Sequence, residues 1–461
     1  MDFATIGRLW GEIERELRLV DPCFTREEPR GHLRTYIKGQ LSNIPRKSIE
    51  PMALAASTPP RTLQKFLSHH AWDETGMRDR MQRLIAREHA DEHAVGVIDD
   101  TAHPKKGRHT PGVKRQYCGA TGKIDNCTIS VHLAYAGDDM RVLLDSEVYV
   151  PKEWADDAAR RCDAGIPEAV EFREKWRIAL SLLDRATANG VRFRWLTFDE
   201  GYGQGLDFLF TLSDRGQRWV AEVPTAIHGW VREPRVMRRE HGRRVGRPRR
   251  QPRVFVQDSR VSSVENLFRH SPVFRNQPWT PLRVKDTTTG PVVWEVKRAK
   301  LWLRRDGLPT AEHGLVVARH ALTGEIKYFV TNAPSTVRIE EIMSVAFTRW
   351  TVERCFEDAK TELGLSHFEV RNWRSLTRHL LLTALGLLVL SRVTSRHRPK
   401  SAGTHSVSDA DGGRRLAAVE VDVSRQIDRV PPTRGRRPGA VPKTRRRVLG
   451  GASQENDRTA A

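Results

Sequence analysis

The chain has 461 residues, and its 78 Lys and Arg outnumber its 57 Asp and Glu, giving a formal net charge of +21. Roughly 150 residues per domain allow about three domains. The longest apolar run, residues 380–390, is shorter than the ~20 residues that cross a bilayer, and residues 1–16 lack the apolar stretch of a signal peptide. We therefore expect a cytoplasmic protein without a membrane partner. Its arginine excess favours a polyanion, nucleic acid above all, although a merely basic soluble protein is the alternative.

Residues 5–89 carry apolar side chains at the three- and four-residue spacing of amphipathic helices. Residues 57–60 read Ser-Thr-Pro-Pro and separate two short helical segments. The second segment carries Arg61 and Lys65, as the second helix of a DNA-reading helix-turn-helix would. We predict a helical domain over residues 1–92 that binds DNA, with a purely structural bundle as the alternative.

Residues 93–224 are expected to form the first part of an α/β core. Strand-like runs cover 94–100, 127–136, 141–150, 192–199 and 218–223, and helical patterns cover 167–189, ended by Gly190, and 205–215. Three strands followed by alternating helix and strand predict a mixed sheet.

Residues 225–335 are predicted to be a basic, β-rich insertion. Residues 232–253 are rich in arginine and nearly devoid of apolar side chains, so they cannot build a core, and residues 245–253 partly match a minor-groove AT-hook. Strands are expected at 292–303, 314–318 and 326–331. The tryptophans of this segment are Trp230, Trp279, Trp294 and Trp302. They would either stack on an unpaired base or form a small core.

Helical periodicity returns over residues 337–363 and 376–393, so residues 336–393 are expected to end the core with helices. Residues 394–461 are basic and rich in Pro, Gly, Ser and Thr, which predicts a tail that is disordered when free. This tail is either a DNA-binding segment or the product of a disrupted reading frame. The five cysteines are scattered and predict neither a zinc site nor a disulfide framework.

Carboxylates mark the places where α/β folds position active sites. Asp99 and Asp100 end one predicted strand, Asp199 ends another, and Glu353 lies in a predicted helix. Carboxylates from separate elements are the ligands that two hard divalent ions need for phosphoryl transfer. Arg349, Glu353, Glu357 and Lys360 share one face of that helix by spacing, so an ordinary surface of ion pairs is the alternative for Glu353.

Three segments carry a resemblance to a known family. They are IDDTAHPKKGRHTPGVKRQYCGATGKIDNC at 98–127, TFDEGYG at 197–203 and RWTVERCFEDAKTELGLSHFEVR at 349–371. In order and content they resemble bacterial insertion-sequence transposases of the DDE superfamily, in the branch with a Tyr-Arg-Glu-Lys signature. The resemblance implies an RNase H-like catalytic core interrupted by a β-rich insertion between the second and third acidic residues.

The resemblance also implies roles for individual residues. Asp100, Asp199 and Glu353 would be the catalytic metal ligands, and Arg349 and Lys360 would contact DNA phosphates near the cleaved end. The position of the signature's tyrosine holds Ala346, so a contact made by that hydroxyl is not expected. Asp99 is the alternate first ligand, because adjacent strand residues point to opposite sides. Asp100 is preferred since it precedes a threonine, as the family's first aspartate typically does.

A basic loop follows the first aspartates and is expected to hold DNA phosphates beside the site, with a solvated loop as the alternative. Its cations are Lys105, Lys106, Arg108, Lys114 and Arg115. The predicted function is DNA transposition: the protein would bind inverted repeats as at least a dimer, cleave DNA and join 3′-hydroxyl ends to target DNA. Mg²⁺, or Mn²⁺, would be the cofactor, as two ions. A nuclease that no longer transposes and an inactive, degenerate element remnant that only binds DNA are the alternatives.

Overall fold

The structure is a computed structural model that describes residues 3–237, 251–258, 260–287 and 290–397. All of these residues belong to one compact unit. Nearly all of the predicted tail and most of the arginine-rich stretch, including the greater part of the partial AT-hook, lie outside the described residues. The domain boundaries expected near residues 92, 224 and 335 stay predictions.

The N-terminal segment is helical, as expected. Its elements are α1 (Phe3–Leu17), the 3₁₀ helix η1 (Arg18–Cys23), α2 (Glu27–Gln40), α3 (Ile49–Ala55), α4 (Pro60–Ser68) and α5 (Glu74–Glu88). Pro60 is the first residue of α4, where a missing N–H costs nothing. Leu63, Phe66 and Leu67 bury one face of α4, which leaves Arg61 and Lys65 exposed. A DNA-reading role for α4 stays a prediction.

The core sheet begins with four antiparallel strands and continues with two that run parallel to the first. They are β1 (Val95–Pro104), β2 (Lys114–Cys118), β3 (Lys123–Ala136), β4 (Arg141–Val148), β5 (Trp195–Phe198) and β6 (Trp219–Glu222). β3 pairs antiparallel with β1, β2 and β4, whereas β1, β5 and β6 run parallel side by side. This mixed order, β4-β3-β1-β5-β6, is the RNase H-like core that the sequence predicts.

Helices connect β4 to β6. They are α6 (Lys152–Ala155), α7 (Ala158–Ala164), α8 (Lys175–Ala188), α9 (Glu200–Gly203) and α10 (Leu206–Asp214). The prediction of one helix over residues 167–189 is wrong at its start, because α8 begins only at Lys175. The Arg161 guanidinium binds the carbonyls of Pro167 and Glu168 at 2.9 and 3.1 Å. Those two carbonyls are therefore already engaged outside any helical hydrogen-bond ladder.

The segment after β6 extends the same sheet. Its elements are β7 (His228–Trp230), β8 (Val236–Met237), β9 (Arg253–Val254), η2 (Val256–Asp258), β10 (Ser262–Ser263), α11 (Val264–His270), α12 (Pro272–Arg275), β11 (Thr280–Thr287), β12 (Gly290–Arg305), β13 (Leu308–His320) and β14 (Ile326–Thr331). β14 pairs antiparallel with β6, and β13 and β12 follow, so the described strands form a 12-stranded sheet beside the two-stranded β8–β9 pair. Trp230, Trp294 and Trp302 are buried, as a core role predicts.

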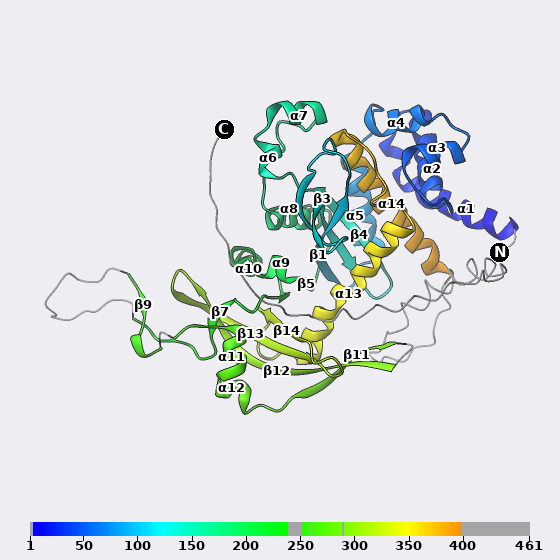
Figure 1. Ribbon diagram of the computed structural model, residues 1–461. Helices are drawn as coiled ribbons and strands as arrows, with labels where there is room; N and C mark the ends of the chain where they lie inside the picture. Colours follow the sequence, from blue (N-terminus) through cyan, green and yellow to red (C-terminus); the bar gives the residue numbers. More distant parts are fainter. Residues whose placement is uncertain (1–2, 238–250, 259, 288–289, 398–461) are drawn as a thin grey trace, which may run out of the picture. The chain divides into compact units, whose positions relative to one another are not determined.

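Two long helices complete the fold, α13 (Ile339–Thr361) and α14 (Trp373–Arg396). α13 contacts β1, β3, β4, β5 and β6 of the core and also β11. α14 packs against β4 and the N-terminal helices α1, α2, α4 and α5, beside which Figure 1 shows it in orange. α14 is long and apolar enough to cross a membrane by length and composition, but 78% of its most apolar window is buried within the fold. It is the buried helix that the apolar run predicts.

Candidate active site

The parallel strands β1 and β5 bring the predicted aspartates together. The prediction that Asp99 and Asp100 end their strand is wrong, because β1 stays paired with β3 as far as Pro104. The two strands run parallel with Ile98 opposite Phe198, so Asp99 and Asp199 each follow a paired residue. Their charges are close enough that Asp199 contributes to the pKa of Asp99. Asp99 and Asp199 therefore lie close together, as the sequence predicts for active-site carboxylates.

Asp199 is held by the turn that follows it. Its side chain caps α9 by accepting a hydrogen bond from the Tyr202 backbone N–H at 3.3 Å. Gly203 then passes against β6, where a Cβ atom would lie 1.9 Å from the Glu222 carbonyl oxygen. This glycine is the close backbone approach that the Asp-Glu-Gly-Tyr-Gly sequence predicts.

Arg349 of α13 is the cation around which the carboxylates gather. Its guanidinium binds Glu353 at 2.7 Å and Glu222, the last residue of β6, at 3.3 Å. Burial alone would lower the pKa of Arg349, but the charges of Glu222, Glu353, Asp99 and Asp199 raise it. Glu353, with 53% of its side chain exposed, thus joins the group through Arg349, whose own side chain is only 14% exposed.

The aspartates carry an unfavourable excess of negative charge. Burial, followed by the charges of Asp199 and Asp100, raises the pKa of Asp99 to about 7. Burial and the charge of Asp100 also raise the pKa of Asp199. Carboxylates that are hard to ionise because they crowd one another are stabilised by a divalent cation, which makes this group a candidate metal site.

Asp99 and Asp100 face different helices, because neighbouring strand residues point to opposite sides. The Lys175 ammonium at the start of α8 binds Asp100 at 2.8 Å. Asp99 instead lies on the side of Arg349 and Lys360, both from α13: its charge acts on the pKa of each. Burial lowers the pKa of Lys360, whereas Asp99 raises it. The side that holds Asp99 is therefore also the side of Glu353.

Three further side chains belong to the site but were not predicted from the sequence: Glu222, Tyr202 and Lys175. Glu222 binds both Arg349 and the Lys327 ammonium, the latter at 2.6 Å. The Tyr202 hydroxyl is buried without a hydrogen-bond partner in the described part of the chain. Burial and the charges of the three nearby aspartates raise its pKa. Glu222 could have been predicted, because it lies near the end of a predicted strand, as Asp199 does. The ion pair between Lys175 and Asp100 could not, because no sequence spacing relates two residues 75 positions apart.

The basic loop after β1 divides into buried and exposed cations. Lys105 donates hydrogen bonds to the carbonyls of Ser366 and Phe368 at 3.0 and 2.7 Å. Burial lowers the pKa of Lys105 to about 7. Lys106, Arg108 and Arg115 are exposed. Lys105 is thus engaged inside the fold and Lys114 pairs with Glu153, whereas Lys106, Arg108 and Arg115 face solvent, where a polyanion can reach them.

The group fits a divalent cation by its donors. Asp99, Asp199 and Glu353 offer carboxylate oxygens, the donors that Mg²⁺ and Mn²⁺ prefer. The orphaned Tyr202 hydroxyl adds a polar atom beside the aspartates. Carboxylates from adjacent strands and a helix of an RNase H-like core, beside cations of that helix, suit phosphoryl transfer through divalent metal ions.

Comparison with known proteins agrees with this class. Residues 19–291 match the family described as DDE superfamily endonuclease. That match covers more than half of the chain, so the chain belongs to this family, whose members use divalent metal ions.

Two individual proteins are similar to it. The probable transposase for insertion sequence element IS701 of Microchaete diplosiphon is 29% identical over 187 residues, which are 40% of this chain and 46% of that protein. The chain therefore spans about half the length of this curated relative. The piggyBac transposase in a synaptic complex with hairpin DNA aligns over 88% of this chain and 73% of its own, with 10% identity. Its TM-score is 0.38.

Proposed function

We propose that the protein is a DNA transposase that binds the ends of its element, cleaves DNA and joins the 3′-hydroxyl ends to target DNA. The observation that carries the proposal is the convergence of carboxylates from β1, β5 and α13 around Arg349. Membership of the endonuclease family and similarity to a relative named as a probable insertion-sequence transposase support it. The Tyr-Arg-Glu-Lys branch is part of this proposal, with Arg349 and Lys360 at the arginine and lysine positions.

Within this proposal, Asp99 replaces Asp100 as the first metal ligand. Asp99 shares its side of the sheet with Arg349 and Lys360, the two cations that flank Glu353 on α13. Asp100 is neutralised by Lys175 on the other side. From the sequence alone Asp100 is preferred because it precedes Thr101, but the position of α13 favours Asp99 as the metal ligand. In this proposal Asp100 positions α8 through its ion pair with Lys175.

Asp99, Asp199 and Glu353 would hold Mg²⁺, or Mn²⁺, as two ions. Such ions activate water or a 3′-hydroxyl and stabilise the leaving oxygen in phosphoryl transfer. Arg349 and Lys360 orient the scissile phosphate beside the carboxylates, and a guanidinium suits this task since it binds two phosphate oxygens at once. With Glu353 holding a metal, Arg349 would keep its ion pair with Glu222 and would have its other N–H donors available to phosphate.

The DNA surface in this proposal consists of Lys106, Arg108 and Arg115 beside the site. Their exposed side chains suit phosphate contacts. Lys105 is left out because two backbone carbonyls already engage its ammonium. Double-stranded DNA, both element ends and target, is the partner. A homodimer at least is required to hold two ends, and the protein would act at the nucleoid.

A cleavage assay with matched variants tests the proposal. The full chain is incubated with Mg²⁺ or Mn²⁺ and a plasmid that carries the element's own ends, and nicking and joining are followed on gels. Glu353→Gln is expected to lower the cleavage rate by roughly a hundred- to a thousandfold, as for loss of a group that stabilises developing charge. Glu357→Gln is the control, since Glu357 lies one turn further along α13, is 61% exposed and pairs with Arg354.

Three results separate the alternatives. Cleavage with joining that Glu353→Gln abolishes and Glu357→Gln preserves supports a transposase. Cleavage without joining indicates a nuclease that no longer transposes. An unmodified protein that binds the ends but leaves them uncut with either metal indicates the degenerate remnant.

A further inference from the structure

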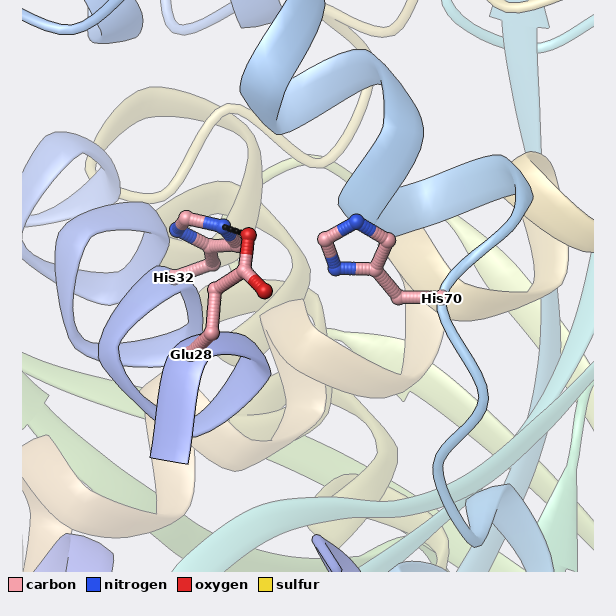
Figure 2. A group of neighbouring side chains, drawn as sticks. All are labelled: Glu28, His32 and His70. Carbon is pink, nitrogen blue, oxygen red and sulfur yellow. Dashed lines mark ion pairs between the residues drawn. The ribbon is translucent and has the colours of Figure 1, made fainter. Parts of the chain in front are cut away.

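A cluster of metal-binding side chains lies in the N-terminal helices, separate from the carboxylates described above. Glu28 and His32 stand one turn apart on α2, and His70 follows the end of α4. One ligand atom from each of the three lies within 4.8 Å of the others. Figure 2 shows the three side chains converging from two segments, with the ion pair between Glu28 and His32 drawn as a dashed line.

Each histidine holds a buried nitrogen without a hydrogen bond, although His32 Nε2 lies in the ion pair with Glu28. His32 Nε2 and His70 Nδ1 are buried and accept or donate no hydrogen bond within the described residues. The centroids of the two imidazole rings are 5.4 Å apart. Burying a polar nitrogen without a partner costs about 1–3 kcal/mol, so two such atoms beside one carboxylate call for a ligand that engages both.

A transition metal meets that requirement better than a proton does. One metal ion engages both nitrogens and the carboxylate oxygen at once, whereas a proton on either ring satisfies a single nitrogen. Two imidazole nitrogens and a carboxylate oxygen are a known donor set for Zn²⁺, with water as the fourth ligand. We propose that Glu28, His32 and His70 bind one Zn²⁺ ion and thereby tie the end of α4 to α2.

The three ligand atoms must move slightly closer together to bind one Zn²⁺ ion. Bonds of about 2.0–2.1 Å in a tetrahedral site place ligand atoms about 3.3 Å apart. Glu28 Oε1 and His32 Nε2 are already 3.7 Å apart. Glu28 is exposed, so its side chain is free to turn toward the metal.

Two arginines near the cluster carry positive charge that disfavours a bound metal ion. Arg26 lies 3.5 Å from Glu28, but its side chain is 76% exposed and is able to move into solvent. Arg378 also acts on the pKa of His70, yet its own guanidinium is bound by Glu74 at 2.8 Å. These two arginines lower the affinity for a cation through their charge, but each has a carboxylate partner of its own. The inference does not depend on the proposed function.

Metal titration of the full chain tests the inference. The protein is stripped with a chelator, dialysed and titrated with ZnCl₂ against a chromophoric zinc indicator. We expect one tight equivalent in the unmodified protein and at least about a tenfold loss of its affinity in His32→Gln and in His70→Gln, since each removes one of three protein ligands. His69→Gln is the matched control, because His69 is the exposed neighbour of His70 and bonds to Ser68, and it should bind zinc unchanged.

A second background keeps the two metal sites apart. In an Asp199→Asn, Glu353→Gln double variant the tight zinc equivalent should persist, and zinc should raise the melting temperature of this variant but not of His70→Gln. Zinc binding that disappears with the carboxylates, or that His32→Gln and His70→Gln leave unchanged, would overturn the inference. Loss of DNA cleavage alone does not bear on it.

Discussion

Single residues of the site show how burial and charge select between neighbours of the same type. Asp99 and Asp100 are adjacent and chemically identical, yet one is crowded by Asp199 and raised in pKa to about 7, and the other is paired with Lys175. The difference follows from the alternation of side chains along β1. A carboxylate that is costly to ionise without a cation is the better candidate for a metal ligand.

This difference predicts unequal effects of two conservative substitutions. Asp99→Asn should lower the metal-dependent cleavage rate by roughly a hundred- to a thousandfold, because it removes a ligand oxygen. Asp100→Asn should lower it by about tenfold or less, since it loses an ion pair of modest strength. Single-turnover cleavage of an end-bearing substrate measures both. Equal losses in the two variants would contradict the assignment of Asp99 as the ligand.

At the scale of elements, the site depends on how tightly α9 approaches β6. Gly203 lets the turn after β5 pass the Glu222 carbonyl, and the same turn holds Asp199 as its capping residue. One backbone contact therefore sets the positions of carboxylates from two strands. α13 completes the site by spanning β1, β5 and β6 with Arg349 and Glu353 on its inner side.

Gly203→Ala is expected to disturb the site through this contact. The added Cβ would meet the Glu222 carbonyl oxygen at 1.9 Å, and backbone atoms cannot move aside as a flexible side chain does. Overpacking of this kind costs about 1–3 kcal/mol of unfolding free energy, measured by urea denaturation, and should also slow cleavage. Gly11→Ala is the control, because a Cβ there meets nothing within 4 Å. A variant with unchanged stability and activity would show that the turn adapts freely.

For the whole molecule, α14 joins the N-terminal helices to the catalytic core through buried polar contacts. His379 of α14 accepts a hydrogen bond from the Tyr36 hydroxyl of α2 at 2.7 Å, and its other nitrogen donates to the Leu365 carbonyl at 3.1 Å. Gln40 of α2 donates to Thr383 at 2.9 Å. The contacts of Tyr36 and Gln40 link residues 343 positions apart, so the two ends of the described chain fold as one unit.

The link predicts that acid destabilises the protein. Burial, together with the charges of Lys105 and His367, lowers the pKa of His379 to about 4. The unfolded chain therefore binds a proton that the folded chain refuses between about pH 6.5 and pH 4, and stability falls as the pH falls. His379 should contribute about 2 kcal/mol of the loss between pH 7.5 and pH 5.

Urea denaturation at the two pH values measures this contribution. His379→Gln is less stable at pH 7.5 because it loses packing, but its further loss at pH 5 should be smaller than that of the unmodified protein by about 2 kcal/mol. His93→Gln, at an exposed histidine, should leave the pH dependence unchanged. The same pH dependence in all three proteins would contradict the role of His379.

The net charge leads to a prediction about salt. If Lys106, Arg108 and Arg115 each contact a phosphate, replacing all three with Gln should reduce the slope of log affinity against log salt by about 2.7. Fluorescence anisotropy with duplex DNA at several salt concentrations measures the slope. Arg215→Gln is the control, because Arg215 pairs with Asp184 in the turn before β6. A slope that the triple variant leaves unchanged would remove this loop from the DNA surface.

The amino-acid sequence by itself determined the class of fold, and it predicted the acidic residues that the structure places near Arg349. Hydrophobic periodicity and turn residues are local properties, and they predicted the strand that leads to Asp199, the helix that carries Glu353 and the helix over residues 376–393. The strand expected to end at Asp100 runs on to Pro104 instead, because its pairing with β3 continues past the aspartates. The prediction that a helix begins at residue 167 was wrong. The Arg161 side chain donates hydrogen bonds to the carbonyls of Pro167 and Glu168, which would have lain in the first turn of that helix.

The tertiary structure decided which of these residues act together. The pairing of Asp100 with Lys175, the place of Glu222 beside Arg349 and the engagement of Lys105 depend on contacts between segments far apart in the chain. The same holds for His32 and His70, which no short spacing connects and which meet only because α4 folds back onto α2. Sequence patterns indicate the secondary structure and the chemistry of residues close together in the chain. The packing of distant segments decides which side chains pair with one another.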